Sequence, residues 1–297
     1  RVLTAIVLVT ILITQFVSGE SIINIWPKPV SVTQGSSNVA VITNPSKFTF
    51  DTGNVPSGEA QQILSSAIDR YRSLIFYKSL TARDSSPLCS RSDYTCVSGV
   101  QFNFEKGSTG DDLDLDMDER YAIGMKIGDK SVTISCYSVW GALRALETLS
   151  QIILIEDQQL DQSNPYYTFS LELPLTIADE PRFKWRGFMI DTSRHYLPVA
   201  KIISIIKALS YYKFNVLHWH VVDAQSFPLV VPTAPELSKK GAYSPKAVYT
   251  TDDIDVIVKT AKLHGIRVIH EYDVPGHAAS WGYGYPEITA KCPSYVH

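Results

Sequence analysis

Three apolar runs in the second half of the sequence each end in side chains that can carry chemistry. The runs lie within residues 186–282, and the polar residues at or just beyond their ends are Asp191, Arg194, His218, His220, Asp223, Glu271, Asp273 and His277. Carboxylates and imidazoles at such spacing suit proton transfer or metal binding. An arginine guanidinium suits a two-pronged contact with neighbouring oxygens. These runs therefore mark the region to examine for a catalytic or binding site.

Two helical patterns separate the three runs. The first follows Pro198, which can occupy a first helical turn, and its apolar residues recur at helical spacing: Val199, Ile202, Ile203, Ile206 and Leu209. The second begins near Thr250 and ends at His264 and Gly265, and its predicted buried residues are Ile254, Ile257, Val258 and Ala261. Apolar strands joined by such helices predict parallel βαβ units. Because no glycine-rich phosphate loop follows the first strand, a barrel is favoured over an open doubly wound sheet.

The composition changes near residue 180, which divides the chain into two predicted domains. Residues 20–180 mix short alternating runs with helical patterns at 59–78 and 138–155, as in an α+β domain. Residues 181–297 hold the three strand units. Polar residues at strand ends are typical of a (β/α)8 TIM barrel. We predict an α+β N-terminal domain followed by the first part of such a barrel, truncated after about three strands.

The start of the chain predicts a targeting segment. Residues 2–17 are almost wholly apolar and precede Ser18, Gly19 and Glu20, so residues 1–19 resemble an incomplete secretory signal peptide. A single membrane anchor is the alternative, although the run is short for one. We expect the secretory pathway as the route, with the lysosome or the cell exterior as the destination. The net charge of -3 gives no electrostatic case for nucleic-acid binding.

The cysteines fit a secreted protein. Cys89 and Cys96 lie close together between turn-forming residues, which predicts a local disulfide. Cys136 lies in an alternating strand-like run and is expected to be a buried thiol, whereas Cys292 has no evident partner.

Metal chemistry is one alternative for the polar cluster. His218 and His220 form an H-x-H pair, with Asp223, Glu271, Asp273 and His277 as further candidate ligands of a metal-dependent hydrolase. Strand alternation places both histidines on one face and Asp223 on the other, with Trp219, unless a bulge intervenes. This argues against a shared metal. The acidic run at 111–118 lacks the glycine and glutamate of a calcium loop, so we expect it to be a solvated loop.

The motifs around these residues resemble the family 20 glycoside hydrolases, the β-N-acetylhexosaminidases. The similar segments are RGFMIDTSRHYLP, HWHVVDAQSFP and HEYDVPGHAASWG, and the upstream segments NIWPKP and VWGALRALETLSQ resemble that family's N-terminal domain. The resemblance implies exo-hydrolysis of terminal N-acetyl-β-hexosamine residues from glycans, glycoconjugates or chitin fragments, without a cofactor or metal. It leaves open a homodimer of the full-length enzyme.

The resemblance also implies a substrate-assisted retaining mechanism. In the family, the substrate's 2-acetamido oxygen attacks the anomeric carbon; an Asp orients that group, and the adjacent Glu protonates the leaving oxygen. The adjacent Asp-Glu pairs of this chain, Asp118-Glu119 and Asp179-Glu180, precede the predicted barrel. We therefore expect the acid to lie beyond this chain and the fragment to be inactive.

The remaining roles follow from the same resemblance. Arg194 matches the arginine that grips hydroxyls of the terminal sugar, and Asp223 and His277 match a relay that supports the acid. We expect Glu271, Asp273 and Trp281 to contact substrate, although the two carboxylates could instead organise the loop and Trp281 could pack in the core. A carbohydrate-binding protein without catalysis is the non-enzymatic alternative.

Overall fold

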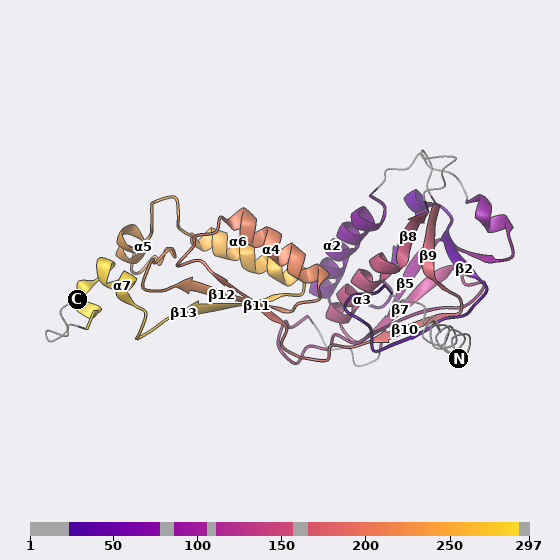
Figure 1. Cartoon of the computed structure of the whole chain (residues 1–297), viewed down its shortest axis with the longest axis horizontal. Helices are drawn as coiled ribbons and strands as arrows, with labels where there is room; N and C mark the ends of the chain where they lie inside the picture. The colour runs from indigo at the N-terminus through magenta and orange to yellow at the C-terminus, as the bar shows by residue number, and fades with distance from the viewer. Residues whose placement is uncertain (1–23, 78–85, 106–110, 157–165, 291–297) are drawn as a thin grey trace, which may run out of the picture.

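The computed structural model describes residues 24–77, 86–105, 111–156 and 166–290. Over these residues the molecule is elongated (Figure 1). One end holds two sheets with helices α2 (Gly58–Ile75) and α3 (Val139–Ile152), and the other holds a three-stranded sheet with α4 (Val199–Tyr211) and α6 (Thr251–Leu263). The change from one part to the other follows β10, close to the predicted boundary at residue 180.

The N-terminal part is built on a six-stranded mixed sheet in the order β1-β10-β6-β7-β5-β3. Its strands are β1 (Ser31–Thr33), β3 (Thr49–Asp51), β5 (Gly99–Phe104), β6 (Tyr121–Met125), β7 (Ser131–Cys136) and β10 (Leu175–Asp179). Buried and more exposed residues alternate along β6 and β7, as a strand covered on one face requires. A second sheet has the order β4-β2-β9-β8. Its strands are β2 (Val39–Ile42), β4 (Tyr94–Val97), β8 (Ile153–Glu156) and β9 (Tyr166–Glu172).

The two helices predicted in this part are confirmed, but both end earlier than predicted: α2 ends at Ile75 and not near residue 78. Helix α2 begins after Ser57, whose hydroxyl accepts the Ala60 backbone N–H. Helix α3 is buried almost all round and contacts strands of both sheets. The second helical pattern was predicted to reach residue 155, but α3 ends at Ile152, because the next four residues form β8 and pair with β9.

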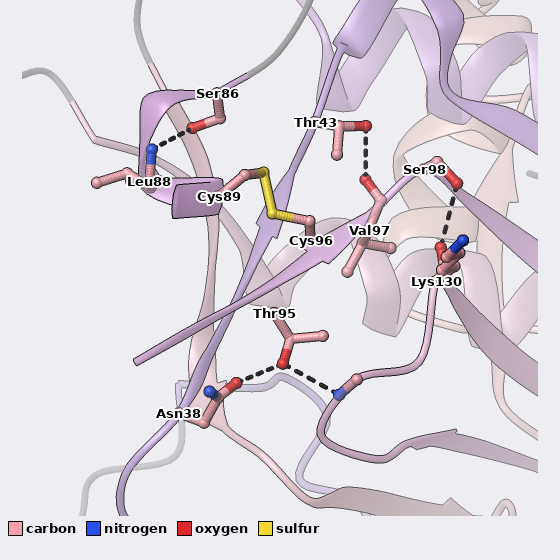
Figure 2. The surroundings of a disulfide bond; sticks show 11 residues. Asn38, Thr43, Ser86, Leu88, Cys89, Thr95, Cys96, Val97, Ser98 and Lys130 are labelled. Carbon is pink, nitrogen blue, oxygen red and sulfur yellow. Dashed lines mark hydrogen bonds between the residues drawn. A yellow bond between two sulfur atoms is a disulfide. The ribbon is translucent and has the colours of Figure 1, made fainter. Parts of the chain in front are cut away.

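The predicted local disulfide is confirmed. Cys89, in the short 3₁₀ helix η2 (Pro87–Ser90), is bonded to Cys96 of β4, and the hydrogen bonds of Thr95 and Thr43 hold this strand against its neighbours (Figure 2). Cys136 is a fully buried free thiol, and burial raises its pKa to about 12. Cys292 and the predicted signal peptide lie outside the described residues. Among the residues that the structure describes, no helix is both long enough and apolar enough to cross a membrane.

The C-terminal part contains a parallel sheet with the order β11-β12-β13. The strands are β11 (Gly187–Asp191), β12 (Val216–Val222) and β13 (Arg267–Tyr272), and further short helices are α5 (Glu236–Gly241), α7 (Ala279–Gly284) and η3 (Pro286–Ile288). Helices α4 and α6 lie side by side along this sheet (Figure 1). The prediction of parallel βαβ units is therefore confirmed.

Local sequence signals set the ends of α4 and α6. Thr250 and Asp253 form a capping box at the start of α6, and Gly265, with φ +66°, follows its C-cap residue as predicted. Pro198 is the N-cap residue of α4 and lies just before the first turn predicted for it. The prediction that Val258 is buried is wrong: its side chain is 39% exposed, because α6 buries the narrower stripe that contains Ile257 and Ala261.

Buried charges join the two parts of the molecule. Glu119 Oε1 lies 2.7 Å from Arg144 Nε and 2.5 Å from Arg186 Nη2. Lys213 Nζ lies 3.1 Å from Asp179 Oδ2, and burial lowers the pKa of this lysine despite the carboxylate. Glu119 and Asp179 belong to the two adjacent Asp-Glu pairs of the chain, so one member of each pair is held in the junction.

Candidate functional site

The register of the parallel sheet brings three of the polar residues at the strand ends to one level. Asp191 of β11 is paired with His220 of β12, and His220 is paired with Glu271 of β13. All three lie at or near the C-terminal ends of their strands. Paired residues of neighbouring parallel strands share a face of the sheet, so the fold itself gathers these side chains.

Asp223 lies beside His220 and not on the face of Trp219. Simple strand alternation does not hold here, because the register between β12 and β13 shifts between His220 and Val222, which is the kind of irregularity that the sequence prediction left open. Asp223 Oδ2 is consequently 3.0 Å from His220 Nε2. Trp219 is fully buried, and its indole N–H donates to Thr192 Oγ1 over 2.8 Å.

The buried Asp223 carboxylate accepts hydrogen bonds from several sides. Its Oδ1 accepts from the Ala224 backbone N–H at 2.5 Å and lies 3.2 Å from His277 Nδ1. Its Oδ2 lies 2.8 Å from Arg194 Nη2 and also contacts His220, while the side chain is only 1% exposed. Burial opposes ionisation, but the hydrogen bonds from Ala224, His220 and His277, together with the charge of Arg194, outweigh it and lower the pKa of Asp223.

His218, His220 and Glu271 form a second part of the same cluster. Glu271 Oε2 lies 2.8 Å from His220 Nδ1 and 2.5 Å from His218 Nε2. Burial acts to lower the pKa of His220, but its hydrogen bonds to Glu271 and Asp223 outweigh this and raise it. The hydrogen bond from His220 is the largest cause of a lowered pKa at Glu271. From the sequence, these histidines were candidates only for metal binding; their two-residue spacing on one strand was the signal of a shared partner.

Arg194 is held at the cluster by partners on three sides. Its Nη1 donates to Asp191 Oδ2 over 2.6 Å, its Nε donates to Gln225 Oε1 over 2.7 Å, and its Nη2 pairs with Asp223. The side chain remains 36% exposed. These contacts fix the plane of the guanidinium while leaving part of it open to a ligand. No feature of the sequence singles out Gln225.

His277 and Asp273 lie at the open side of the cluster. His277 has a left-handed backbone conformation, with φ +56°, and its side chain is 63% exposed. Its Nδ1 faces the buried Asp223 and lies 4.0 Å from Asp273 Oδ2. The ring thus reaches from solvent to Asp223, and the structure brings together all the predicted polar site residues.

Trp281 lies on α7 beside this cluster and packs against a hydrophobic neighbour. Its ring meets that of Phe227 edge-to-face, with ring centroids 5.0 Å apart. Its indole nitrogen is buried and has no hydrogen-bond partner among the described residues. The described contact is one of core packing, and contact with substrate stays a prediction.

The geometry offers ligand atoms for a metal but surrounds them with competing cations. Candidate ligand atoms of His220, Asp223 and Asp273 lie within 4.8 Å of one another. However, Arg194 already pairs with Asp223, and His220 directs both ring nitrogens at carboxylates. A metal-bound histidine must be neutral and must direct a lone pair at the ion. The arrangement therefore favours a proton and hydrogen-bond network over a metal centre.

A cleft of about 590 Å³ lies away from this cluster, at the junction of the two parts. Its lining includes Lys28, Glu119, Asp179, Arg186 and Lys213. Most of these charges are paired with one another across the junction. We interpret the cleft as part of the contact between the two parts.

Two family descriptions match the chain. Residues 25–152 match the family described as "beta-acetyl hexosaminidase like", and residues 183–296 match "Glycosyl hydrolase family 20, catalytic domain". The second match includes the whole polar cluster, and the first covers most of the N-terminal part.

Curated relatives are similar over nearly the whole chain. Beta-hexosaminidase subunit A1 of Dictyostelium discoideum is 36% identical over 98% of this chain and 49% of its own length. Beta-hexosaminidase 1 of Arabidopsis thaliana is 41% identical over 89% of the chain and 48% of its length. The human beta-hexosaminidase subunit beta is 36% identical over 91% of this chain and 46% of its own length. The chain thus spans about half the length of the curated relatives it matches.

Solved structures agree with these matches. The chitobiase of Flavobacterium johnsoniae superposes with a TM-score of 0.66 at 28% identity, covering 89% of this chain and 36% of that one. An N-acetyl-beta-hexosaminidase of Streptomyces plicatus gives a TM-score of 0.63 at 24% identity, and the match covers 89% of this chain and 48% of that one. At this identity, the similarity supports the fold alone.

Proposed function

Because the chain belongs to glycosyl hydrolase family 20, we propose that it is part of an exo-β-N-acetylhexosaminidase. The complete enzyme would remove terminal non-reducing N-acetyl-β-hexosamine residues from glycans, glycoconjugates or chitin fragments. The observation that carries this proposal is the Asp223–His277 pair beside Arg194 at the C-terminal ends of parallel strands.

The site supports distinct roles for these three residues. Asp223 is held ionised, so the hydrogen bond between Asp223 and His277 requires a proton on His277 Nδ1. Nε2 on the opposite edge of the ring can then contact a catalytic carboxyl group. Arg194, fixed but half-exposed, can direct its remaining N–H groups at hydroxyls of the terminal sugar.

The chemical step would be substrate-assisted and retaining. The substrate's 2-acetamido oxygen attacks the anomeric carbon, the glycosidic bond breaks, and a glutamic acid protonates the leaving oxygen. We place this acid and its partner aspartate in the complete enzyme, outside the described residues. Glu119 and Asp179 do not fit these roles, since both are ion-paired at the junction.

The architecture of the complete enzyme is part of the same proposal. Residues 20–180 would form its N-terminal α+β domain, and residues 181–297 the opening units of an eight-stranded barrel. Residues 1–19 would direct it into the secretory pathway, towards the lysosome or the cell exterior. A homodimer remains a hypothesis for the complete enzyme.

A double-mutant cycle in the complete enzyme tests the relay. Asp223→Asn and His277→Ala should each lower kcat/KM for a β-GlcNAc substrate roughly 10- to 150-fold. This corresponds to a loss of about 1.5–3 kcal/mol of transition-state stabilisation, because each change removes a charge-assisted hydrogen bond. The double variant should lose little more than the worse single variant, since both changes break one network. Asp255→Asn, an exposed carboxylate on α6, is the matched control.

Other outcomes would favour the alternatives. Fully additive losses would contradict the relay. Stoichiometric bound zinc in elemental analysis would support the metal-dependent hydrolase, and sugar binding without turnover by the complete protein would support the non-catalytic reading.

A further inference from the structure

His220 contacts a carboxylate oxygen through each of its ring nitrogens. Nδ1 lies 2.8 Å from Glu271 Oε2, and Nε2 lies 3.0 Å from Asp223 Oδ2. A neutral imidazole carries one N–H and one lone pair, so it can donate to only one of the two oxygens. The other nitrogen would direct its lone pair at a negative charge. Only the imidazolium form satisfies both contacts.

The surroundings of His220 favour a positive charge. Carboxylates approach from all three strands: Asp191 from β11, Asp223 from the end of β12, and Glu271 and Asp273 from β13 and the residues after it. The neighbouring cation is Arg194, which contacts Asp191 and Asp223. His218 reaches the cluster through Glu271, and His277 reaches it through Asp223. Four carboxylates therefore surround one guanidinium and three imidazoles.

We propose that His220 is a positively charged positioning residue, which bridges Glu271 to Asp223 and sets the charge that Asp223 presents to His277. This inference rests on the proposed function, because the charge of His220 acts on the proposed Asp223–His277 relay. The bridge runs from His218 through Glu271, His220 and Asp223 to His277, alternating imidazole and carboxylate.

The bridge makes the relay sensitive to pH. While His220 is protonated, Asp223 receives donors from His220, Arg194 and His277 and stays ionised and oriented. When His220 loses its proton, one donor is lost, and the negative charges of Glu271 and Asp223 are less compensated. The Asp223 carboxylate is then less firmly oriented towards His277 Nδ1. Activity should therefore decline as pH rises through the pKa of His220.

The closing experiment measures the protonation of His220 directly. In the complete enzyme labelled with ¹⁵N-histidine, with the signal assigned by its loss in His220→Gln, both ring nitrogens should be protonated at pH 6. The signal should titrate above the usual value of about 6.5. Glu271→Gln keeps a polar group of the same shape but removes the charge, and it should lower the pKa of His220 by about one unit or more. Asp255→Asn should leave it unchanged. A His220 with one unprotonated nitrogen at pH 6, or an equal pKa in the Glu271→Gln variant, would overturn the proposal.

A kinetic measurement separates this inference from the proposed function. In Glu271→Gln, the decline of kcat/KM at high pH should begin at a lower pH than in the parent, displaced by as much as the pKa of His220 falls in the NMR titration, whatever the rate on the acidic side of the profile. A purely structural role would lower the rate equally at all pH values. If the complete enzyme hydrolyses no β-hexosaminide, the proposed function fails, but the NMR titration still decides the charge of His220.

Discussion

At the scale of single residues, the site depends on charges that hold one another in place. Asp223 has almost no exposure, yet donors from four residues keep it ionised. The same donors restrict the movement of their own side chains, so Arg194 and His277 are fixed before substrate binds. Under the proposed function, such preorganisation lowers the free-energy cost of ordering the site when a sugar binds.

The first residue-scale prediction concerns Arg194. Arg194→Lys in the complete enzyme should lower kcat/KM for a chromogenic β-GlcNAc substrate. The expected loss of transition-state stabilisation is about 1.5–3 kcal/mol, because an ammonium group cannot contact Asp191, Asp223 and sugar hydroxyls together. Lys201→Arg on α4 is a control for basic substitution outside the cluster. Kinetics within twofold of the parent would remove Arg194 from the site.

At the scale of elements, local sequence signals predict most helices and strands because those signals act through the backbone. Ser57, Ser138 and the Thr250–Asp253 capping box mark three helix starts, and Gly265 follows the end of α6. The end of α3 was missed because β8 is set by pairing with β9, a contact distant from the helical pattern. The side of the sheet on which Asp223 lies could not be decided for a related reason. Its position depends on a register shift between two strands, which sequence alternation does not contain.

The element-scale prediction concerns acid sensitivity at the end of α6. His264 is buried at the C-cap, its Nδ1 lies 2.8 Å from Thr260 O, and its Nε2 has no partner among the described residues. Burial is the main cause, with the charge of Arg70 second, of a pKa lowered to about 4. The unfolded chain binds this proton near pH 6.5, so the contribution to stability is complete above pH 6.5 and declines as pH falls towards 4.

Urea unfolding of the complete protein can measure this contribution. Between pH 7 and pH 5, protonation of His264 should remove about 2 kcal/mol from the free energy of unfolding. The glutamine in His264→Gln does not titrate. The free energy of unfolding of this variant should therefore fall by about 2 kcal/mol less than that of the parent between pH 7 and pH 5. Equal pH dependence in the parent and the variant would show that His264 does not titrate as its burial requires.

At the scale of the whole molecule, the two parts are coupled by buried ion pairs and by the approach of α2 and α3 to the C-terminal part. Arg144 of α3 donates to Gly265 O over 2.9 Å, and Arg70 of α2 donates to Leu263 O over 2.9 Å. A buried charge that loses its partner is strongly destabilising, so these contacts tie the stability of the described βα units to the N-terminal part. The C-terminal end of α6, a helix that packs on the sheet carrying the Asp223 cluster, is therefore held by residues of the N-terminal part.

The whole-molecule prediction is that the 297-residue polypeptide does not hydrolyse a β-N-acetylhexosaminide. Release of the leaving sugar needs a proton donor. Glu119 and Asp179, one member of each adjacent Asp-Glu pair, are committed to the junction. The three-stranded sheet also exposes apolar side chains, among them Phe188, Met189 and Tyr272, so this polypeptide should associate or precipitate when purified.

Assays of purified polypeptide with a chromogenic β-GlcNAc substrate check this prediction, and size-exclusion chromatography checks the association. A matched preparation carrying Asp223→Asn and His277→Ala controls for contaminating host enzyme, because its relay is removed while contaminants remain. Turnover by the parent polypeptide, absent from the control, would mean that the catalytic acid lies within these residues. Glu271 and Asp273 would then be the first candidates, since both carboxylates lie beside His220 at the open end of the strands.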